Sequence, residues 1–326
     1  MPANLPPQYF EAEKRLREAK SLPEKIASLE AMLAIMPHHK GTDKLRATLR
    51  RKLSKLRDEG EQRRGGARAY LYSVRREGAG QVPLVGASNA GKSHLVAALT
   101  NADPEIADYP FTTQRPQAGM MVFENIQIQL VDLPAVTEEH TEPWVFNILR
   151  GADALLVVLD LSQDPLTELE TTLKVLQAQK IVVLGSDPEE TEHGIFPKSV
   201  LVVGNKGDLT GADGNLAILQ ELFSERLHII MISAKEGLHL EGLKGQVYSL
   251  LDVLRVYSKR PGHEPDFSAP VILKRGSTVL DLAKEIHKDF YNRLQYARIW
   301  GSGKFDGQRV QRDYLLQEGD IIELHI

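Results

Sequence analysis

Apolar residues recur every three or four positions through the N-terminal part of the chain. Within residues 8–36 they fall on one stripe, formed by Leu22, Ile26, Leu29, Leu33 and Met36. This spacing places side chains on one face of an α-helix, and Pro37 ends the run. A second stripe predicts a helix over residues 42–59 and consists of Leu45, Leu49, Leu53 and Leu56. The Pro-His-His-Lys-Gly turn between the two runs favours an antiparallel helical hairpin.

The pattern changes at residue 82, where short apolar runs begin to alternate with amphipathic helical stretches. Such alternation is typical of a mostly parallel sheet covered by helices, so we expect an α/β domain. The predicted strands are residues 82–85, 120–124, 126–132, 154–160, 200–204 and 228–232. The predicted helices begin near Gly91, Glu142, Leu166, Gly214 and Leu240.

The last part of the chain has a β-rich pattern. It follows residues 258–266, which are rich in helix and strand breakers and indicate a linker. One helix is expected over residues 279–292, and a final strand over 321–326. We therefore divide the chain into a helical, basic segment (1–66), an α/β domain (67–257), a linker (258–266) and a small β-rich domain (267–326).

Composition excludes several classes of protein. The chain has no cysteine, which excludes disulfides and thiolate metal sites and favours a cytoplasmic location. No run reaches the roughly 18 apolar residues of a membrane span, and the N-terminal stretch lacks the apolar core of a secretory signal. We expect a protein without a membrane partner.

Charge is distributed unevenly although the formal net charge is only −4. Residues 40–76 contain thirteen Lys or Arg but four Asp or Glu. A local excess of positive charge suggests a polyanion partner, and RNA is a better candidate than DNA for a cytoplasmic protein. The alternative interpretation is a solvated helix face with no partner.

A phosphate-binding loop follows the first predicted strand of the α/β domain. Its sequence matches G-x-x-x-x-G-K-[ST], and with the next residue it comprises Gly86, Ala87, Ser88, Asn89, Ala90, Gly91, Lys92, Ser93 and His94. Backbone N–H groups and a helix N-terminus can hold phosphates here. Lys92 can reach the β- and γ-phosphates, and the Ser93 hydroxyl can bind Mg²⁺.

Three further segments stand at strand ends in the order expected of a GTP site. Asp132 ends a strand and can hold the Mg²⁺ shell. Asn205, Lys206 and Asp208 form an Asn-Lys-Gly-Asp segment, in which the Asp carboxylate can accept two guanine hydrogens that adenine does not offer. The next segment, whose backbone can contact the guanine O6, is Ser233, Ala234 and Lys235. Strand carboxyl ends form ligand sites in open α/β sheets, so the sequence predicts GTP/GDP rather than ATP.

These motifs, together with the Asp-Tyr-Pro-Phe-Thr-Thr segment that ends at Thr113, resemble the Obg/DRG group of translation-associated GTPases. The stretches that begin at Leu273, Tyr296 and Glu318 are similar to a TGS domain. The resemblance implies a P-loop GTPase domain and a β-grasp-like TGS domain. It also implies that Thr113 closes on Mg²⁺ and the γ-phosphate, and that Lys92, Thr113 and Asn89 act in catalysis.

Two positions bear on whether GTP is hydrolysed. The family pattern Asp-x-Pro-Gly reads Asp-Leu-Pro-Ala here, so Ala135 stands where a glycine N–H normally meets the γ-phosphate. Alanine resists backbone angles that glycine allows. Asn89 has two interpretations: related GTPases use Asn here to hold K⁺ against the phosphates, but Asn is also a common turn residue. His140 is either a water-positioning residue or simply exposed.

The sequence thus supports two hypotheses of function. In the first, the protein hydrolyses GTP slowly and its nucleotide state controls docking on the ribosome or another RNA, through the basic hairpin and the TGS domain. In the second, it is a GTP-binding adaptor with little or no hydrolysis, because of Ala135.

Overall fold

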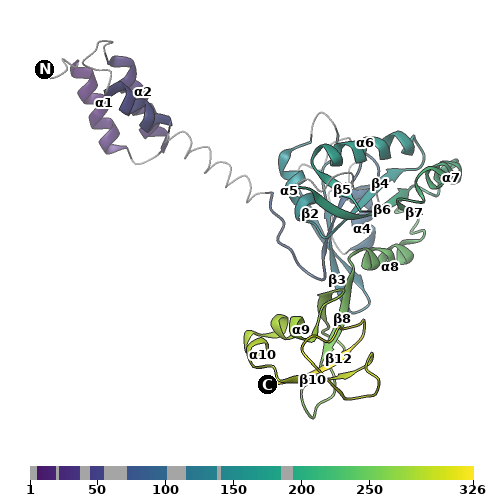
Figure 1. Ribbon diagram of the computed structural model, residues 1–326. Helices are drawn as coiled ribbons and strands as arrows, with labels where there is room; N and C mark the ends of the chain where they lie inside the picture. The colour runs from purple at the N-terminus through teal and green to yellow at the C-terminus, as the bar shows by residue number, and fades with distance from the viewer. Residues whose placement is uncertain are drawn as a thin grey trace. The chain divides into compact units, whose positions relative to one another are not determined.

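The computed structural model describes residues 6–19, 22–36, 45–54, 72–100, 115–137, 141–184 and 194–326. The chain divides into two compact units, Met1–Ser73 and Val74–Ile326. The described part of the first unit is helical, and the second contains both β-sheets (Figure 1).

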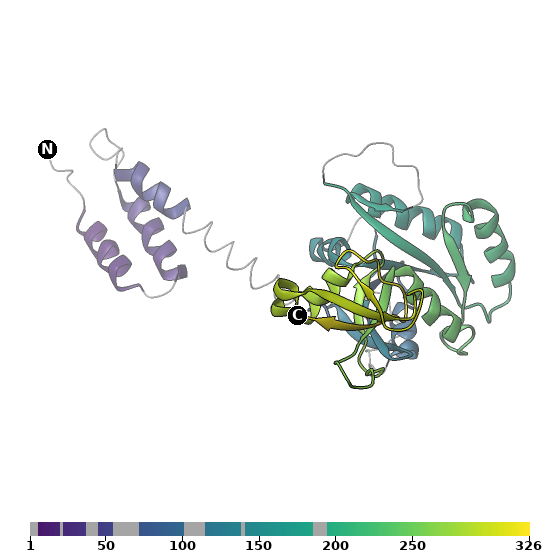
Figure 2. The ribbon, with the colours of Figure 1, turned by 60° about the horizontal axis from the view of Figure 1, so that its bottom comes forward.

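The N-terminal unit packs its helices around a small core. It contains α1 (Pro7–Glu18), α2 (Leu22–Ile35) and a helical segment over residues 45–54, which lie side by side in both ribbon views (Figure 1, Figure 2). The buried side chains come from all three: Tyr9, Ala12, Leu29, Met32, Met36 and Leu49. Leu29, Met36 and Leu49 of the predicted stripes are therefore part of a core, and Leu33, Leu45 and Leu53 pack against it, whereas Leu56 lies outside the described residues.

One prediction for this unit was wrong in detail, because the run over residues 8–36 is two helices rather than one. The backbone leaves the helical region at Ala19 (φ −62°, ψ 118°). Pro23 lies in the first turn of α2, where a backbone N–H has no helical partner and a proline is tolerated. Arg46, which the charge pattern placed on a solvated or RNA-binding face, is buried and donates to Met36 O at 2.8 Å.

The α/β sheet has seven strands in the order β2-β3-β1-β4-β6-β5, with β7 also paired to β6. Only β2 is antiparallel to its neighbour. The strands are β1 (Gln81–Val85), β2 (Gln117–Phe123), β3 (Ile126–Asp132), β4 (Ala154–Asp160), β5 (Ile181–Val183), β6 (Phe196–Asn205) and β7 (His228–Met231). The mostly parallel fold is confirmed. The short edge strand β5 was not predicted.

Helices cover both faces of this sheet, which is why β4 is apolar at nearly every position. On one face, Leu155, Val157 and Leu159 of β4 join the core formed with α5 (Pro143–Gly151), α6 (Pro165–Ala178) and α7 (Ala212–Phe223). On the other, Leu156 and Val158 pack with α4 (Lys92–Leu99) and α8 (Leu240–Leu250). All five helices begin within two residues of their predicted starts.

Pro83 lies inside β1 although proline lacks the N–H that a sheet ladder needs. Gln129 N–H donates to Gly80 O, and Asp153 N–H donates to Gln81 O. Alternate residues of β1 therefore bond to β3 and to β4, and position 83 falls on the β4 side. The ladder with β4 begins only at Leu84, so the proline stands at the start of that pairing.

The second sheet has five strands in the order β11-β10-β12-β8-β9, with only the β12–β8 pair parallel. Its strands are β8 (Val253–Ser258), β9 (Val271–Lys274), β10 (Tyr296–Trp300), β11 (Gln308–Val310) and β12 (Ile321–His325). Because β8 pairs with both β12 and β9, the structure corrects the predicted boundary. The predicted linker, residues 258–266, begins at the last residue of β8 and lies within the connection from β8 to β9, inside the β-rich domain rather than between two domains.

The helix expected over residues 279–292 is divided into α9 (Val279–Ile286) and α10 (Lys288–Arg293). The break falls at His287, whose backbone is extended and whose ring nitrogen accepts from Asp289 N–H. A capping box begins α9, since Thr278 Oγ1 accepts from Asp281 N–H and the Asp281 carboxylate accepts from Thr278 N–H.

Arg255 of β8 connects the second sheet to the β2–β3 hairpin. Its guanidinium forms ion pairs with Glu124, in the hairpin turn, and with Glu318, and it lies 5.1 Å from the centroid of the Tyr248 ring of α8. Glu318 also accepts from the Tyr248 hydroxyl at 2.8 Å. Burial, with a smaller effect of Glu318, raises the pKa of Tyr248 to about 12. A charged contact thus joins the second domain to strands that lead to the predicted site.

Candidate nucleotide site

The phosphate loop connects β1 to α4 and can be built only with glycine at two of its positions. A Cβ on Gly86 would lie 2.2 Å from Val158 O, and one on Gly91 would lie 2.1 Å from Asn205 Nδ2. Gly91 has φ +92° and Asn89 has φ +64°. The loop therefore runs close against its neighbours and wraps a space above the N-terminus of α4.

Lys92 lies buried beneath this loop. Its Nζ donates to Gly86 O at 3.0 Å and to Ala87 O at 2.7 Å. Burial lowers the pKa of Lys92 to about 8, although the nearby carboxylates of Asp132 and Glu168 act in the opposite direction. With this pKa, the Lys92 amine is partly neutral near pH 8. An anion that binds close to it favours the charged, protonated form.

The side chains that sequence analysis assigned to Mg²⁺ meet between α4 and β3. Ser93 Oγ donates to Asp132 Oδ2 at 2.5 Å, and Asp132 is buried at the end of its strand. A hydroxyl and a carboxylate are oxygen ligands of the kind that Mg²⁺ prefers. Within the described part of the chain, Ser88 Oγ is buried without a hydrogen-bond partner, which is consistent with a polar ligand in the loop. Thr113 and His140 lie outside the described residues.

Asn205 joins the phosphate loop to the base-binding segments. Its Nδ2 donates to Ala90 O at 2.9 Å, and its Oδ1 accepts from Ala234 N–H at 3.0 Å. Only 3% of Asn205 is exposed. One amide therefore holds three of the predicted motifs together, at the carboxyl ends of their strands.

The two remaining residues that are predicted to bind the base are Asp208 and Lys235. Asp208 is exposed, and a hydrogen bond from Ser233 is the largest of the effects that lower the pKa of its carboxyl. Ser233 itself is fully buried, so it holds the carboxylate from below. Lys235 is exposed at the surface, and its Nζ lies 3.6 Å from the carboxylate of Glu236. An ionised, accessible Asp208 can act as a double acceptor.

Two further predicted site residues, His94 and Ala135, lie at the edge of the site. His94 is exposed on α4, so a contact with phosphate there would come from its backbone N–H. Ala135 is half-buried, and the next residue, Val136, donates its N–H to Gly86 O at 3.3 Å. The segment after β3 is thereby attached to the phosphate loop in spite of the missing glycine.

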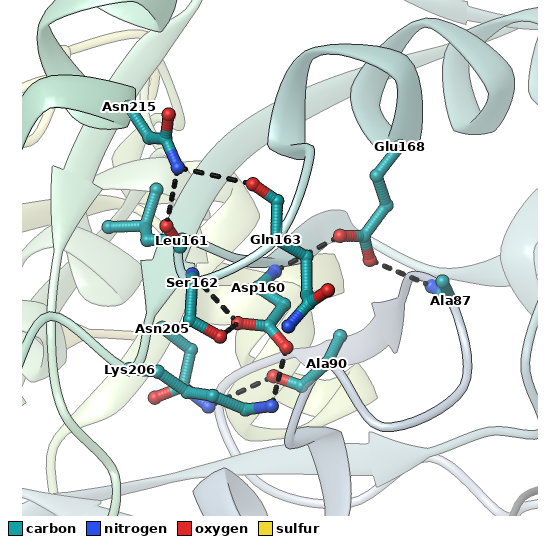
Figure 3. A network of polar contacts seen from close by, with 10 residues as sticks. All are labelled: Ala87, Ala90, Asp160, Leu161, Ser162, Gln163, Glu168, Asn205, Lys206 and Asn215. Atoms are coloured by element: carbon teal, nitrogen blue, oxygen red, sulfur yellow. Dashed lines mark hydrogen bonds and ion pairs between the residues drawn. The ribbon is translucent and has the colours of Figure 1, made fainter. Parts of the chain in front are cut away.

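Sequence analysis missed two acidic residues beside the site, Asp160 and Glu168 (Figure 3). Asp160 Oδ2 lies 2.5 Å from Lys206 Nζ, and Glu168 accepts from Ala87 N–H in the phosphate loop. Asp160 could have been found because it ends a predicted strand, as Asp132 does. Nothing in the local pattern around Glu168 distinguishes it from other helix residues.

Comparisons with known proteins agree with this geometry. A family model described as a 50S ribosome-binding GTPase matches residues 81–186, and a TGS domain model matches residues 254–326. An uncharacterised GTP-binding protein of Methanocaldococcus jannaschii is 31% identical, over 95% of this chain and 94% of that protein. Developmentally-regulated G-protein 3 of Arabidopsis thaliana is 27% identical, over 92% and 98%.

The chain belongs to the Obg/DRG family of GTP-binding proteins. This Obg/DRG protein is also similar to the crystal structure of a GTP-binding protein from Pyrococcus horikoshii, with a TM-score of 0.51, 17% identity and coverage of 75% of this chain and 99% of the other. That likeness concerns the fold. No helix in the described part of the Obg/DRG protein is long and apolar enough to cross a bilayer.

Proposed function

We propose that the protein hydrolyses GTP to GDP and phosphate, and that its nucleotide state controls docking on the ribosome or another RNA. The observation that carries the proposal is Asn205, which holds the phosphate loop and the base-binding segments in one site. The loop N–H groups and Lys92 bind the phosphates, and Asp208 selects guanine. Ser93, Asp132 and Thr113 hold Mg²⁺, which neutralises phosphate charge.

Intrinsic hydrolysis should be slow. Val136 stands where other GTPases place a glutamine that orients the attacking water, and it is buried. Lys92 stabilises charge on the phosphates but cannot orient water, since its Nζ is held by loop carbonyls. A GTPase that has neither a water-orienting group nor an arginine finger hydrolyses GTP at about 10⁻³ s⁻¹ or less. A partner or a second cation would then set the rate.

The β-rich C-terminal domain, which the TGS model matches, has a surface suited to binding RNA. Tyr296, Arg298 and Trp300 alternate along β10 and face away from its buried core. The Arg309 guanidinium lies 4.0 Å from the centroid of the Tyr296 ring, and Lys259 Nζ lies 4.1 Å from that of Trp300. Interleaved aromatic and cationic side chains on a sheet are typical of surfaces that bind single-stranded RNA. The family model described as ribosome-binding matches residues 81–186 of the α/β domain, so it supports a ribosome as partner but not this surface in particular.

The proposal is tested by GTP hydrolysis with purified protein in KCl and in NaCl, each with and without ribosomes. We expect ribosomes to raise turnover by about tenfold or more, because an ordered switch supplies the missing orientation. Stimulation by KCl alone would assign Asn89 to a K⁺ site, whereas equal rates would leave it as a turn residue. Ribosome pelleting that is identical with GTP, GDP and no nucleotide would contradict the switch.

The adaptor hypothesis rests on Ala135 and predicts that Ala135→Gly changes turnover. If alanine damps the switch, glycine should raise turnover about tenfold, because it allows the backbone angles that bring the N–H to the γ-phosphate. The measurement is single-turnover GTP hydrolysis, with the exposed Ala217→Gly as a control for loss of a methyl group elsewhere. An unchanged and already substantial rate would reject the adaptor.

A further inference from the structure

Glu168 is a half-buried carboxylate in the first turn of α6 that bridges two strand ends (Figure 3). Its Oε1 accepts from Ala87 N–H at 3.2 Å, and its Oε2 accepts from Asp160 N–H at 3.0 Å. Ala87 is in the phosphate loop after β1, and Asp160 ends the adjacent strand β4. One side chain from outside the recognised motifs therefore holds the phosphate loop against the neighbouring strand.

Asp160 continues this connection toward the guanine side. Its Oδ2 lies 2.5 Å from Lys206 Nζ, and its Oδ1 accepts from the backbone N–H and the hydroxyl of Ser162 at 2.9 and 2.6 Å. Lys206 belongs to the Asn-Lys-Gly-Asp segment. The path Ala87, Glu168, Asp160, Lys206 thus joins phosphate loop and base-binding segment independently of Asn205.

The loop between β4 and α6 is itself held from a third element. Asn215 of α7 donates from Nδ2 to Leu161 O at 2.8 Å and to Gln163 O at 3.1 Å. A loop fixed in this way gives Glu168 a defined position relative to Asp160. The carboxylate is then preorganised for its two N–H donors rather than ordered by the ligand.

We propose that Glu168 is a positioning residue for the nucleotide: its ionised carboxylate holds the Ala87 peptide and the Asp160–Lys206 pair at one spacing, so that phosphate and guanine are bound together. The inference rests on the nucleotide site of the proposed function but requires neither hydrolysis nor ribosome docking. Its test is therefore nucleotide binding alone.

The groups around Glu168 shift its pKa, so its proposed positioning role can be tested by measuring nucleotide affinity as a function of pH. Burial raises the pKa of Glu168, Asp160 adds to that effect, and the two N–H donors and Lys92 oppose it. Burial also acts to raise the pKa of Asp160, but the hydrogen bonds from Lys206 and Ser162 lower it overall. As pH falls, Glu168 therefore takes up a proton before Asp160 does. A protonated carboxyl cannot accept equally well at both oxygens.

The experiment compares full-length wild type with Glu168→Gln, and with Glu170→Gln as a matched control on the exposed side of α6. The amide retains the shape but replaces one acceptor by a donor. We expect Glu168→Gln to raise the Kd for GDP and for GTP alike by about tenfold, the size of one charged hydrogen bond. Glu170→Gln should bind as wild type does.

The pH profile separates positioning from a merely structural role. As pH falls below neutrality, the wild-type affinity for GDP should decline more steeply than that of Glu168→Gln, because only the wild type has a carboxylate to protonate at this position. The terminal phosphate, with a pKa near 6, titrates in both proteins and cancels in the comparison. Equal affinities of the two Gln variants, or parallel pH profiles of wild type and Glu168→Gln, would overturn the proposal.

Folding of the variant is checked by circular dichroism and thermal unfolding. If Glu168→Gln does not fold, a double-mutant cycle of Glu168→Asp with Asp160→Asn replaces it. Residues in one path should give coupled effects on the Kd for GDP, whereas additive effects would overturn the path. Failure of wild type to bind GDP would instead contradict the nucleotide site itself.

Discussion

Replacing Asp208 by Asn should change the protein from one that binds GTP to one that prefers xanthosine triphosphate. The carboxylate of Asp208 is exposed and ionised at neutral pH, and the hydrogen bond from Ser233 is the largest of the effects that lower its pKa further. It can accept two hydrogens, from N1 and from the 2-amino group of guanine. An asparagine amide offers one acceptor and one donor, which matches the N1–H and the 2-carbonyl oxygen of xanthine.

We expect the Kd for GTP to rise about a thousandfold in Asp208→Asn, since one charge-assisted bond is lost and a donor then faces the 2-amino group. The Kd for xanthosine triphosphate should fall by a similar factor. Isothermal titration calorimetry with each nucleotide measures the two Kd values. Asp213→Asn, at an exposed position in the first turn of α7, is the matched control and should retain GTP preference. Weakened binding of both nucleotides would show that Asp208 serves the loop's structure rather than base selection.

Lys92→Ala should weaken binding of GDP and GTP by about a hundredfold or more. The side chain lies 7% exposed beneath the phosphate loop, where its charge acts on phosphates with little screening by water. Alanine also leaves Gly86 O and Ala87 O without the donor that they share. The measurement is GDP affinity by fluorescence of a labelled nucleotide, with the exposed Lys284→Ala as control. A loss of less than tenfold would show that backbone N–H groups dominate phosphate binding.

The depressed pKa of Lys92 gives this prediction a second, independent readout. Burial lowers the pKa to about 8, and bound phosphates raise it again because they favour the charged form. Nucleotide binding near pH 8.5 should therefore take up a proton. The affinity should be highest below pH 8 and decline as pH rises above it. Calorimetry in buffers of different ionisation enthalpy measures the proton uptake, which Lys92→Ala should abolish.

Local sequence patterns predicted most of the α/β domain because its signals are short-range. The continuous apolar run of β4 is required where helices cover both faces of a parallel sheet, and its bounds, Ala154–Asp160, are those expected. The phosphate loop is equally explicit, since Gly86 and Gly91 stand where a Cβ would collide with neighbouring atoms. Motif order along the chain was sufficient to predict guanine binding, which membership of the family supports.

Boundaries between elements were less predictable where tertiary contacts outweigh local pattern. The sequence pattern assigns residues up to 257 to the α/β domain. In the structure most of β8 falls in that range, yet β8 forms its hydrogen-bonded pairs with β9 and β12 of the second sheet. The pattern over residues 8–36 predicts one helix, but its apolar stripe begins at Leu22 and belongs to α2, while the backbone of α1 leaves the helical region at Ala19. Pairing across a sheet depends on residues far apart in the chain, which periodicity does not encode.

The sequence by itself determined the class of nucleotide, the strands that carry the motifs, and the mostly parallel, helix-covered sheet to which they belong, but not the order of the strands in that sheet. The tertiary structure alone decided which side chains outside the motifs complete the site. Glu168, which lies outside the motifs, is 81 positions from Ala87; the structure also decided how motifs contact each other, since Asn205 and Ala90 are 115 positions apart. Their hydrogen bonds exist because parallel strands bring their carboxyl ends to one edge, where helix starts and loops from distant parts of the chain converge.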